Sequence, residues 1–274
     1  MSVPRVLIVN DDGIHSPGLL AAVEAVQPFA DVLVAAPTRQ QTASGRAMTG
    51  NREDTFHAID LGLRQAVNGV RAWHIDASPA LVVQHALAVL CPDGLPDLVV
   101  SGINYGENLS TDIGASGTVG AAFEAAIHGI PAIAVSRQTG TEHHFVYGDL
   151  DWSDARRVLG SWVKRVLEYL ASDRPGTDGL PFDVLKIDVP DPCPPGTEER
   201  VTQLAQNRYL QFRIDKPAAD TPLKASLLTI EVDPTQFSPE DDVYAFAVDR
   251  VVAVTPLTSD WTAPLSKVAE FFRS

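Results

Sequence analysis

Short apolar segments alternate with helical patterns over roughly the first two thirds of the chain. The apolar segments lie at residues 6–9, 31–36, 70–75, 98–100 and 131–135, and they are rich in β-branched residues, as strands covered on both faces are. Helices are predicted from Pro17 onward and over residues 80–90, 118–128 and 153–170. A strand at 183–189 can join the same sheet. This alternation predicts an α/β fold with a doubly wound, Rossmann-like, mostly parallel sheet.

The pattern changes beyond residue 190, after a link over 173–181 that is rich in Pro, Gly and Asp. Residues 206–214, 225–232 and 242–254 alternate apolar and polar side chains and have no long helical segment between them, which predicts antiparallel hairpins. We therefore expect a Rossmann-like catalytic domain over residues 1–190 and a smaller β-hairpin region, which serves oligomerisation, over residues 191–274.

Composition and charge argue against some classes of binding partner as the main one. The chain has 274 residues, of which 45% are hydrophobic, and a net charge of −14 from 21 Lys and Arg against 35 Asp and Glu. An acidic protein repels nucleic acid and anionic membranes, so neither is expected as a main partner. The chain has no apolar run long enough to span a membrane, and only four apolar residues in a row near its start, too few for a secretory leader. Its two cysteines form no CxxC motif, and we expect a cytoplasmic protein.

Three polar segments follow predicted strands and can meet at one edge of the sheet. They are residues 10–13 (Asn-Asp-Asp-Gly), 42–45 (Thr-Ala-Ser-Gly) and 101–104 (Ser-Gly-Ile-Asn). Ligands of doubly wound sheets bind outside the carboxyl ends of the strands, where these segments are expected. The three segments therefore form the candidate site.

The adjacent acids Asp11 and Asp12 point to a bound cation. Two neighbouring carboxylates at the end of a buried strand repel each other unless a cation or strong donors neutralise them. Mg²⁺ or Mn²⁺ prefers carboxylate, amide and hydroxyl oxygens, and Asp11, Asp12, Thr42 and Asn104 match that preference. Alternatively, Asp12-Gly13 is a simple turn in which Asp11 caps a backbone amide.

Phosphate-binding groups are expected at the start of the helix predicted over residues 118–128. The backbone N–H groups of Ser116, Gly117 and Thr118 and the helix dipole can hold a phosphate there. Ser44 and Gly45 can supply further donors. The alternatives are ordinary N-capping by Ser116 or Thr118 and a generic turn at residues 44–45.

Two function classes fit these residues: a metal-dependent phosphomonoesterase and a non-catalytic, phosphate-responsive receiver module. A receiver needs an Asp after a middle strand and a Lys after a late strand, whereas residues 101–104 and 136–138 read Ser-Gly-Ile-Asn and Ser-Arg-Gln. A dinucleotide-binding dehydrogenase needs GxGxxG where this chain has acids. The DxD spacing of Asp149 and Asp151 supports an aspartyl nucleophile only weakly, and His143-His144 is interpreted as a surface pair.

Several motifs resemble the stationary-phase survival protein SurE family of nucleotidases. They are Val-Asn-Asp-Asp-Gly-Ile (9–14) with Ser16 and Gly18, Ala-Pro (36–37) followed by Ala-Ser-Gly (43–45), Ser-Gly-Ile-Asn-Tyr-Gly-Glu-Asn (101–108), Ser-Gly-Thr-Val (116–119), Gly-Ile-Pro-Ala-Ile-Ala (129–134) and Val-Thr-Pro-Leu-Thr (254–258). These motifs occur in the family's order and cover residues 5–136 well.

The resemblance implies a 5′/3′-nucleotidase that hydrolyses nucleoside monophosphates by attack of a metal-activated water. It implies one divalent ion, Mg²⁺ or Mn²⁺, per subunit at Asp11, Asp12, Thr42 and Asn104. The family usually carries Ser where this chain has Thr42, whose β-branching stiffens the side chain. The resemblance also implies a homodimer or homotetramer formed through C-terminal hairpins.

On this hypothesis several residues of the motifs have specific roles in catalysis and substrate binding. Asn10 and Asn108 orient substrate or water, while Asp11 or Asp12 accepts the proton. The phosphate-binding residues are Ser44, Gly45, Asn108, Ser116, Gly117 and Thr118. Tyr105 either stacks on a base or serves in packing.

Overall fold

A mostly parallel sheet forms the centre of the computed structural model, which describes residues 3–63, 69–144, 146–172, 179–263 and the single residues 265, 268 and 272. Nine strands make this sheet within the described ranges, in the order β3-β4-β2-β1-β5-β6-β7-β11-β8. The strands are β1 (Arg5–Val9), β2 (Asp31–Pro37), β3 (His57–Ile59), β4 (Arg71–Ile75), β5 (Leu98–Tyr105), β6 (Ala132–Arg137), β7 (Val184–Val189), β8 (Glu199–Val201) and β11 (Val252–Leu257).

The strands from β4 to β7 run parallel, whereas β3 is antiparallel to β4 and β11 is antiparallel to β7. Strand β1 lies between β2 and β5, so the chain winds in opposite directions on its two sides. The carboxyl ends of β1 and β5 therefore flank the topological switch point, where ligands of such sheets bind. The predicted doubly wound α/β fold is confirmed.

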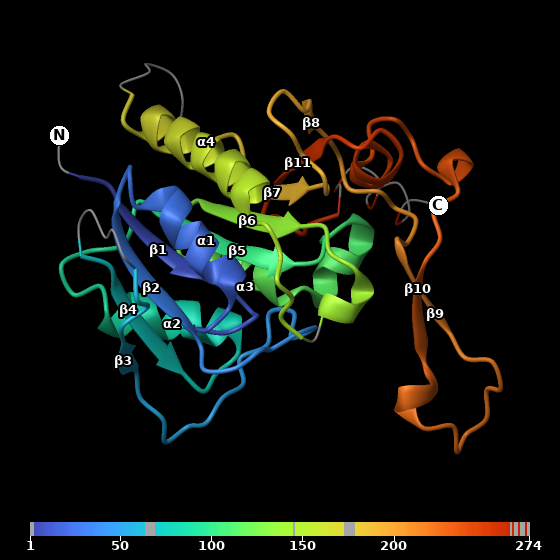
Figure 1. Ribbon diagram of the computed structural model, residues 1–274, viewed down its shortest axis with the longest axis horizontal. Helices are drawn as coiled ribbons and strands as arrows, with labels where there is room; N and C mark the ends of the chain where they lie inside the picture. The colour runs from blue at the N-terminus through green and yellow to red at the C-terminus, as the bar shows by residue number, and fades with distance from the viewer. Residues whose placement is uncertain are drawn as a thin grey trace.

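Helices cover both faces of the sheet (Figure 1). Helices α1 (Pro17–Val26) and α4 (Ser153–Leu170) pack together on one face, and α2 (Pro79–Val89) and α3 (Gly117–Ile127) pack together on the other. Short helical turns η1 (Ser110–Ala115) and η2 (Thr141–His143) lie in the loops between strands and helices. Of the predicted helices, 153–170 has the observed bounds and the first begins at Pro17 as predicted, while those predicted over 80–90 and 118–128 lie one residue earlier at both ends.

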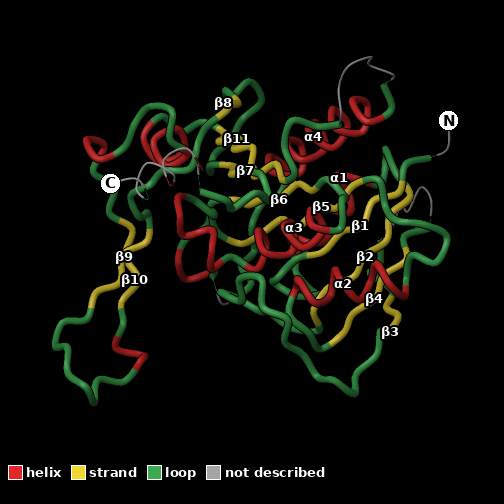
Figure 2. Tube along the Cα trace, turned by 180° about the vertical axis from the view of Figure 1, so that it is seen from behind, coloured by secondary structure: helices red, strands yellow, loops and turns green. Residues whose placement is uncertain are grey.

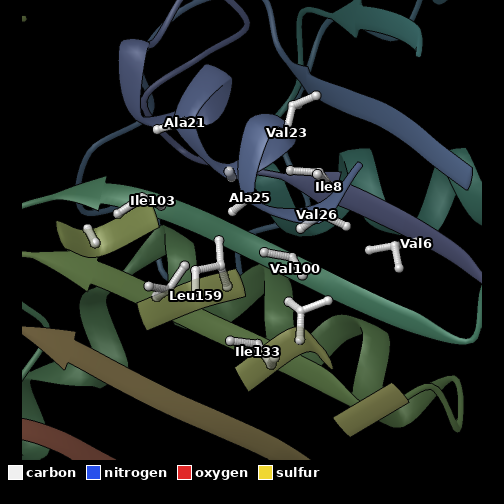
Figure 3. Close-up of a cluster of buried hydrophobic side chains, with 14 of the residues drawn as sticks. Val6, Ile8, Ala21, Val23, Ala25, Val26, Val100, Ile103, Ile133 and Leu159 are labelled. Carbon is white, nitrogen blue, oxygen red and sulfur yellow. The ribbon is translucent and has the colours of Figure 1, made fainter. Parts of the chain in front are cut away.

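The alternation of side chains along β1 explains why its sequence is apolar from Val6 to Val9. Val6 and Ile8 pack with α1 and α4, while Leu7 and Val9 pack with α2 and α3. Figure 3 shows Val6 and Ile8 among Val23, Val26 and Val100 in the first of these two clusters. A strand with two buried faces has no polar position until it ends, so the first acids of this region mark the edge of the sheet.

Helix α4 has 18 residues and one apolar face. Its buried positions are Ala155, Val158, Leu159, Val163, Val166 and Leu167, at spacings of one, three and four residues. Charged side chains occupy the other face. Within the described ranges, no helix combines the length and the apolar character that crossing a bilayer requires.

The region after residue 190 differs in part from its prediction. Strands β9 (Leu210–Arg213) and β10 (Leu227–Ile230) form the predicted antiparallel hairpin, which extends away from the sheet (Figure 2). The hairpin strands predicted over 242–254 are wrong for η5 (Tyr244–Val248), which is a π-helical turn, whereas residues 252–254 begin β11, which joins the main sheet beside β7. Short apolar runs do not distinguish helix from strand by periodicity alone. The sheet thus continues past residue 190. The domain boundary expected near residue 190 stays a prediction. Most of the link predicted over 173–181 lies outside the described residues.

Strand β5 is longer than its apolar run predicts. The sequence indicated a strand over 98–100 and a loop after it, but β5 continues to Tyr105, and its register with β6 shifts between Ser101 and Asn104. Ser101, Ile103 and Tyr105 are buried, so this polar stretch belongs to the sheet. The irregularity lies at the end of the strand, where bulges commonly reorient a side chain beside a site.

Candidate active site

Asp11 and Asp12 lie directly beyond β1, in a buried turn. Their exposed fractions are 5% and 2%, and Asn10 before them is fully buried. The Asn10 Oδ1 accepts the N–H of Gly13 at 3.1 Å, which closes the turn. Gly13 has a φ of +96°, and a Cβ there would lie 2.9 Å from the backbone carbon of Arg39, so the turn needs glycine.

The carboxylate of Asp11 faces the first turn of α3. Its Oδ1 accepts the hydroxyl of Thr118 at 2.6 Å. Burial raises the pKa of Asp11, although the Thr118 hydroxyl and the backbone N–H groups of Thr118 and Gly117 oppose the shift. The acid from β1 and the start of α3 therefore form one cluster of groups.

The carboxylate of Asp12 has different partners from that of Asp11. Its two oxygens accept the side-chain amide of Gln40 at 3.1 Å and the backbone N–H of Tyr105 at 3.1 Å. Burial, and after it the charge of Asp11, raises the pKa of Asp12 well above its ordinary value. A cation bound between the two acids would favour both charged forms, which their own surroundings disfavour.

The side chains of Ser44 and Asp11 pack closely against Gly117. A Cβ on Gly117 would lie 2.6 Å from the Ser44 Oγ and 2.7 Å from the Asp11 Oδ2, so this close approach of the two side chains to the start of α3 requires glycine. The Ser44 Oγ is buried and has no hydrogen-bond partner among the residues that the structure describes. A buried hydroxyl without a partner costs free energy unless a ligand or water binds it, so Ser44 is a candidate to bind a polar ligand.

The start of α3 is capped by its own sequence. The Ser116 Oγ accepts the N–H of Val119 at 3.1 Å, as an N-cap does. Gly45 contacts the same region through its N–H, which donates to the carbonyl of Ala115 at 2.9 Å. The N–H groups of Gly117 and Thr118 remain directed at Asp11, so donors for an anion lie beside the acids.

Thr42 lies at the exposed rim of this region. Its hydroxyl donates to the carbonyl of His144 at 3.3 Å, and the amide of Gln40 donates to the same carbonyl at 2.9 Å. Thr42 is thus linked to Asp12 through Gln40 and His144. The interpretation of His143-His144 as surface residues is wrong for His144, which is half-buried and has a buried Nε2 without a partner in the described structure.

The two asparagines of the 101–108 motif differ in their surroundings. The Asn104 Nδ2 donates to the carbonyls of Gly106 at 2.7 Å and Tyr105 at 3.3 Å, while the next residue binds Asp12 through its N–H. The Asn108 Nδ2 donates to the Ser136 Oγ at 2.7 Å, and the Asn108 N–H donates to Asp188 at 2.7 Å. Asn104 therefore borders the acidic pair, whereas Asn108 is held by β6 and β7.

Comparison with known proteins shows the family to which the chain belongs. Residues 6–211 match the family model of the survival protein SurE. The chain belongs to the SurE family. The 5′-nucleotidase SurE of Thermococcus kodakarensis is 39% identical over 266 residues, which cover 94% of each chain. That of Methanocella arvoryzae is 36% identical over 94% of this chain and 93% of its own. The crystal structure of the SurE protein from Aquifex aeolicus has a TM-score of 0.76 and 29% identity, covering 99% of this chain and 100% of that one.

The SurE match contains every candidate site residue, and the structure brings several of them together. Asp11, Asp12, Ser44, Gly117 and Thr118 form the cluster described above, with Asn10, Gly45 and Ser116 in its supporting turns and Thr42 and Asn104 at its border. Asp151, by contrast, accepts the N–H of Ser153 at 2.8 Å beside the start of α4, as expected of a loop acid.

Sequence reasoning missed Gln40 and Tyr147. Gln40 lies in a polar loop with no distinguishing motif, and Tyr147 reaches the acidic turn from the segment before α4, where its hydroxyl donates to the carbonyl of Asp12. The stacking of Tyr105 on a base is excluded in this structure, because Tyr105 is only 4% exposed and packs against Tyr147 and Trp152. The alternative role of Tyr105 in packing is confirmed.

Proposed function

We propose that this SurE protein is a divalent-metal-dependent 5′/3′-nucleotidase that hydrolyses nucleoside monophosphates to nucleoside and phosphate. Relatives at 39% and 36% identity bear the name 5′-nucleotidase SurE. The observation that carries the proposal is the cluster of Asp11, Asp12 and the unpartnered Ser44 hydroxyl beside the start of α3. It combines a place for a cation with donors for an anion, which hydrolysis of a phosphate ester requires.

The residues present fit a hard divalent ion, one Mg²⁺ or Mn²⁺ per subunit. The structure shows no group of three or more His, Cys, Asp and Glu suited to a metal ion in its described ranges, so the ligands would be two carboxylates and neutral oxygens. Asp11, Asp12, Thr42 and Asn104 would hold the ion. The Asn104 Nδ2 already donates to backbone carbonyls, which leaves its carbonyl oxygen as the ligand. When bound, the ion supplies charge stabilisation at the phosphoryl group and a more acidic water.

The chain's own residues then bind the substrate and move a proton. The N–H groups of Gly117 and Thr118, with the hydroxyl of Ser44, would hold the phosphate at the start of α3. Ser116 and Gly45 keep these donors in place through the N-cap and the bond to Ala115. Asp11 or Asp12 would accept the proton of the attacking water, since both carboxylates lie at the proposed metal position. We assign Asn10 and Asn108 to orienting substrate or water.

Phosphate release tests the proposal. The purified protein is incubated with a panel of nucleoside 5′- and 3′-monophosphates, with EDTA, and with Mg²⁺ or Mn²⁺ added back. We expect turnover that EDTA removes and metal restores. Asp11→Asn should lower kcat by more than about 100-fold, since even partners of metal ligands contribute 10- to 100-fold, while the exposed-loop variant Asp149→Asn should keep full activity. Nucleotide binding without turnover at any metal concentration would favour the receiver-like class.

The assembly and compartment belong to the same proposal. The β9–β10 hairpin carries exposed apolar side chains, with Phe212 65% and Leu227 51% exposed, as a segment that pairs with another copy does. We propose a homodimer or homotetramer formed through this region, which light scattering of the purified chain tests. Cys91 and Cys193 are free, which suits a reducing compartment, and we propose the cytoplasm.

A further inference from the structure

Three aromatic rings form a stack that begins in the core and ends at the acidic turn. Trp152, just before α4, meets the ring of Tyr105 edge-on with centroids 4.8 Å apart. Tyr105, at the end of β5, is stacked with Tyr147 at 5.7 Å and an interplanar angle of 29°. The guanidinium of Arg137 lies 5.6 Å from the ring centre of Trp152 and supports the base of the stack. Tyr147 therefore packs on Tyr105, which itself packs on Trp152.

Hydrogen bonds fix the outermost ring beside the proposed metal and phosphate groups. The hydroxyl of Tyr147 donates to the carbonyl of Asp12, and the hydroxyl of Tyr105 donates to the carbonyl of Gly148 at 3.4 Å. The same segment is tied to residues 40–42 through the carbonyl of His144. The ring of Tyr147 is thus attached to the turn that carries both acids.

The two tyrosines of the stack differ in how far they are exposed to solvent. Tyr105 is 4% exposed, whereas Tyr147 is 40% exposed. The ring of Tyr147 packs on Tyr105 on one side, and its hydroxyl binds the carbonyl of Asp12, so the residue is partly exposed next to the acidic turn. A held aromatic ring that exposes a face is the usual platform for a nucleobase, and stacking tolerates different bases.

We propose that Tyr147 is the base-stacking residue of this enzyme, and that it distinguishes nucleotides from phosphate esters without a base. The inference rests on the proposed nucleotidase function and names a binding residue for it. Phosphate recognition would depend on the start of α3, and base recognition on Tyr147. A substrate such as ribose 5-phosphate would use only the first of these.

The test compares KM and kcat for adenosine 5′-monophosphate and ribose 5-phosphate in the wild type, Tyr147→Ala and Tyr147→Phe. Loss of one stacking contact should raise KM for the nucleotide about tenfold in Tyr147→Ala, with KM for ribose 5-phosphate unchanged. Tyr147→Phe keeps the ring and should stay near the wild type for both substrates. The matched control is Phe29→Ala, since Phe29 is 37% exposed but lies before β2, at the opposite edge of the sheet.

Each other outcome overturns the inference in an identifiable way. An equal rise in KM for both substrates would mean that Tyr147 only supports the turn of Asp12. A Phe variant as impaired as the Ala variant would assign the effect to the hydroxyl rather than to the ring. No change with either substrate would exclude contact with the base. A wild type that hydrolyses neither substrate would refute the proposed function itself, before Tyr147 is considered.

Discussion

Two pairs of buried acids in the described part of the chain, Asp11 with Asp12 and Asp188 with Asp242, differ in that only the second contacts a cation of the chain. Asp188 on β7 and Asp242 before η5 both contact the ammonium group of Lys186, and all three side chains are fully buried. Asp11 and Asp12 are almost as deeply buried, but no salt bridge to either acid occurs in the described structure. The carboxylates of Asp188 and Asp242 therefore have a positive partner in the chain, whereas those of Asp11 and Asp12 have none in the described residues.

The oxygens of the Lys186 group are also fully used. Asp188 accepts the N–H of Asn108, and Asp242 accepts those of Ala205, Val243 and Ser110. Burial opposes the charge of Lys186, yet the two carboxylates raise its pKa. This group therefore joins β7, the C-terminal segment and the loop before α3 as a structural element. This difference supports the proposed cation at Asp11 and Asp12, because these two acids have no positive partner in the described chain, whereas Asp188 and Asp242 have Lys186.

Removal of the internal cation should give the largest effect on stability. Lys186→Met leaves two buried carboxylates without their partner, and breaking a buried ion pair in this way costs about 3–5 kcal/mol. Urea denaturation followed by circular dichroism measures the free energy of unfolding. The control is Lys164→Met, because Lys164 is 59% exposed and its pair with Glu168 should contribute less than about 1 kcal/mol. If the two variants were equally stable, the structural role of the Lys186 group would be disproved.

The pH dependence of stability should come next in size. Burial raises the pKa of Asp188 to about 6 from the 3.8 of an ordinary aspartate, against the opposing effect of Lys186. Since the folded state binds this proton more tightly than the unfolded state, the contribution is complete below about pH 4 and is lost as the pH rises through about 6, with an upper limit of roughly 3 kcal/mol.

Urea denaturation between pH 4 and 7 measures this loss. In Asp188→Asn the fall in stability over this interval should be smaller than in the wild type, whereas Asp220→Asn, at an exposed position, should leave it unchanged. An unaltered slope in Asp188→Asn would assign the effect to other groups.

The features that could be predicted from the sequence are those that depend on residues close together along the chain. The apolar run before Asn10 and the capping residues of α3 are local signals, and they correctly placed the acids at the end of β1 and Ser116 at the start of the helix. The metal-ligand and phosphate-binding roles of these residues stay predictions, because the folded chain tests only their positions.

Contacts between distant segments were not predictable in the same way. Gln40 and Tyr147 reach Asp12 across 28 and 135 positions of sequence, and no periodicity connects them. Asn108 lies in a recognisable motif, yet its amide binds Ser136 on β6. A motif gives the order of its residues, whereas the direction of each side chain depends on which strands lie beside it.

The smallest expected effect is a gain in stability, and it concerns Asp11 and Asp12, the acidic pair without a cation. Without metal, Asp11→Asn removes one of two buried, repelling charges and keeps an oxygen for the Thr118 hydroxyl, so it should stabilise the fold by about 1 kcal/mol. With Mn²⁺ at 100 times its dissociation constant, the wild type should gain about 2.7 kcal/mol and the variant much less, so their order reverses. Thermal unfolding in EDTA and in Mn²⁺ measures both differences. A variant less stable than the wild type in EDTA would mean that the chain's own donors already satisfy Asp11, and the distinction between the two acidic groups would then lose its physical basis.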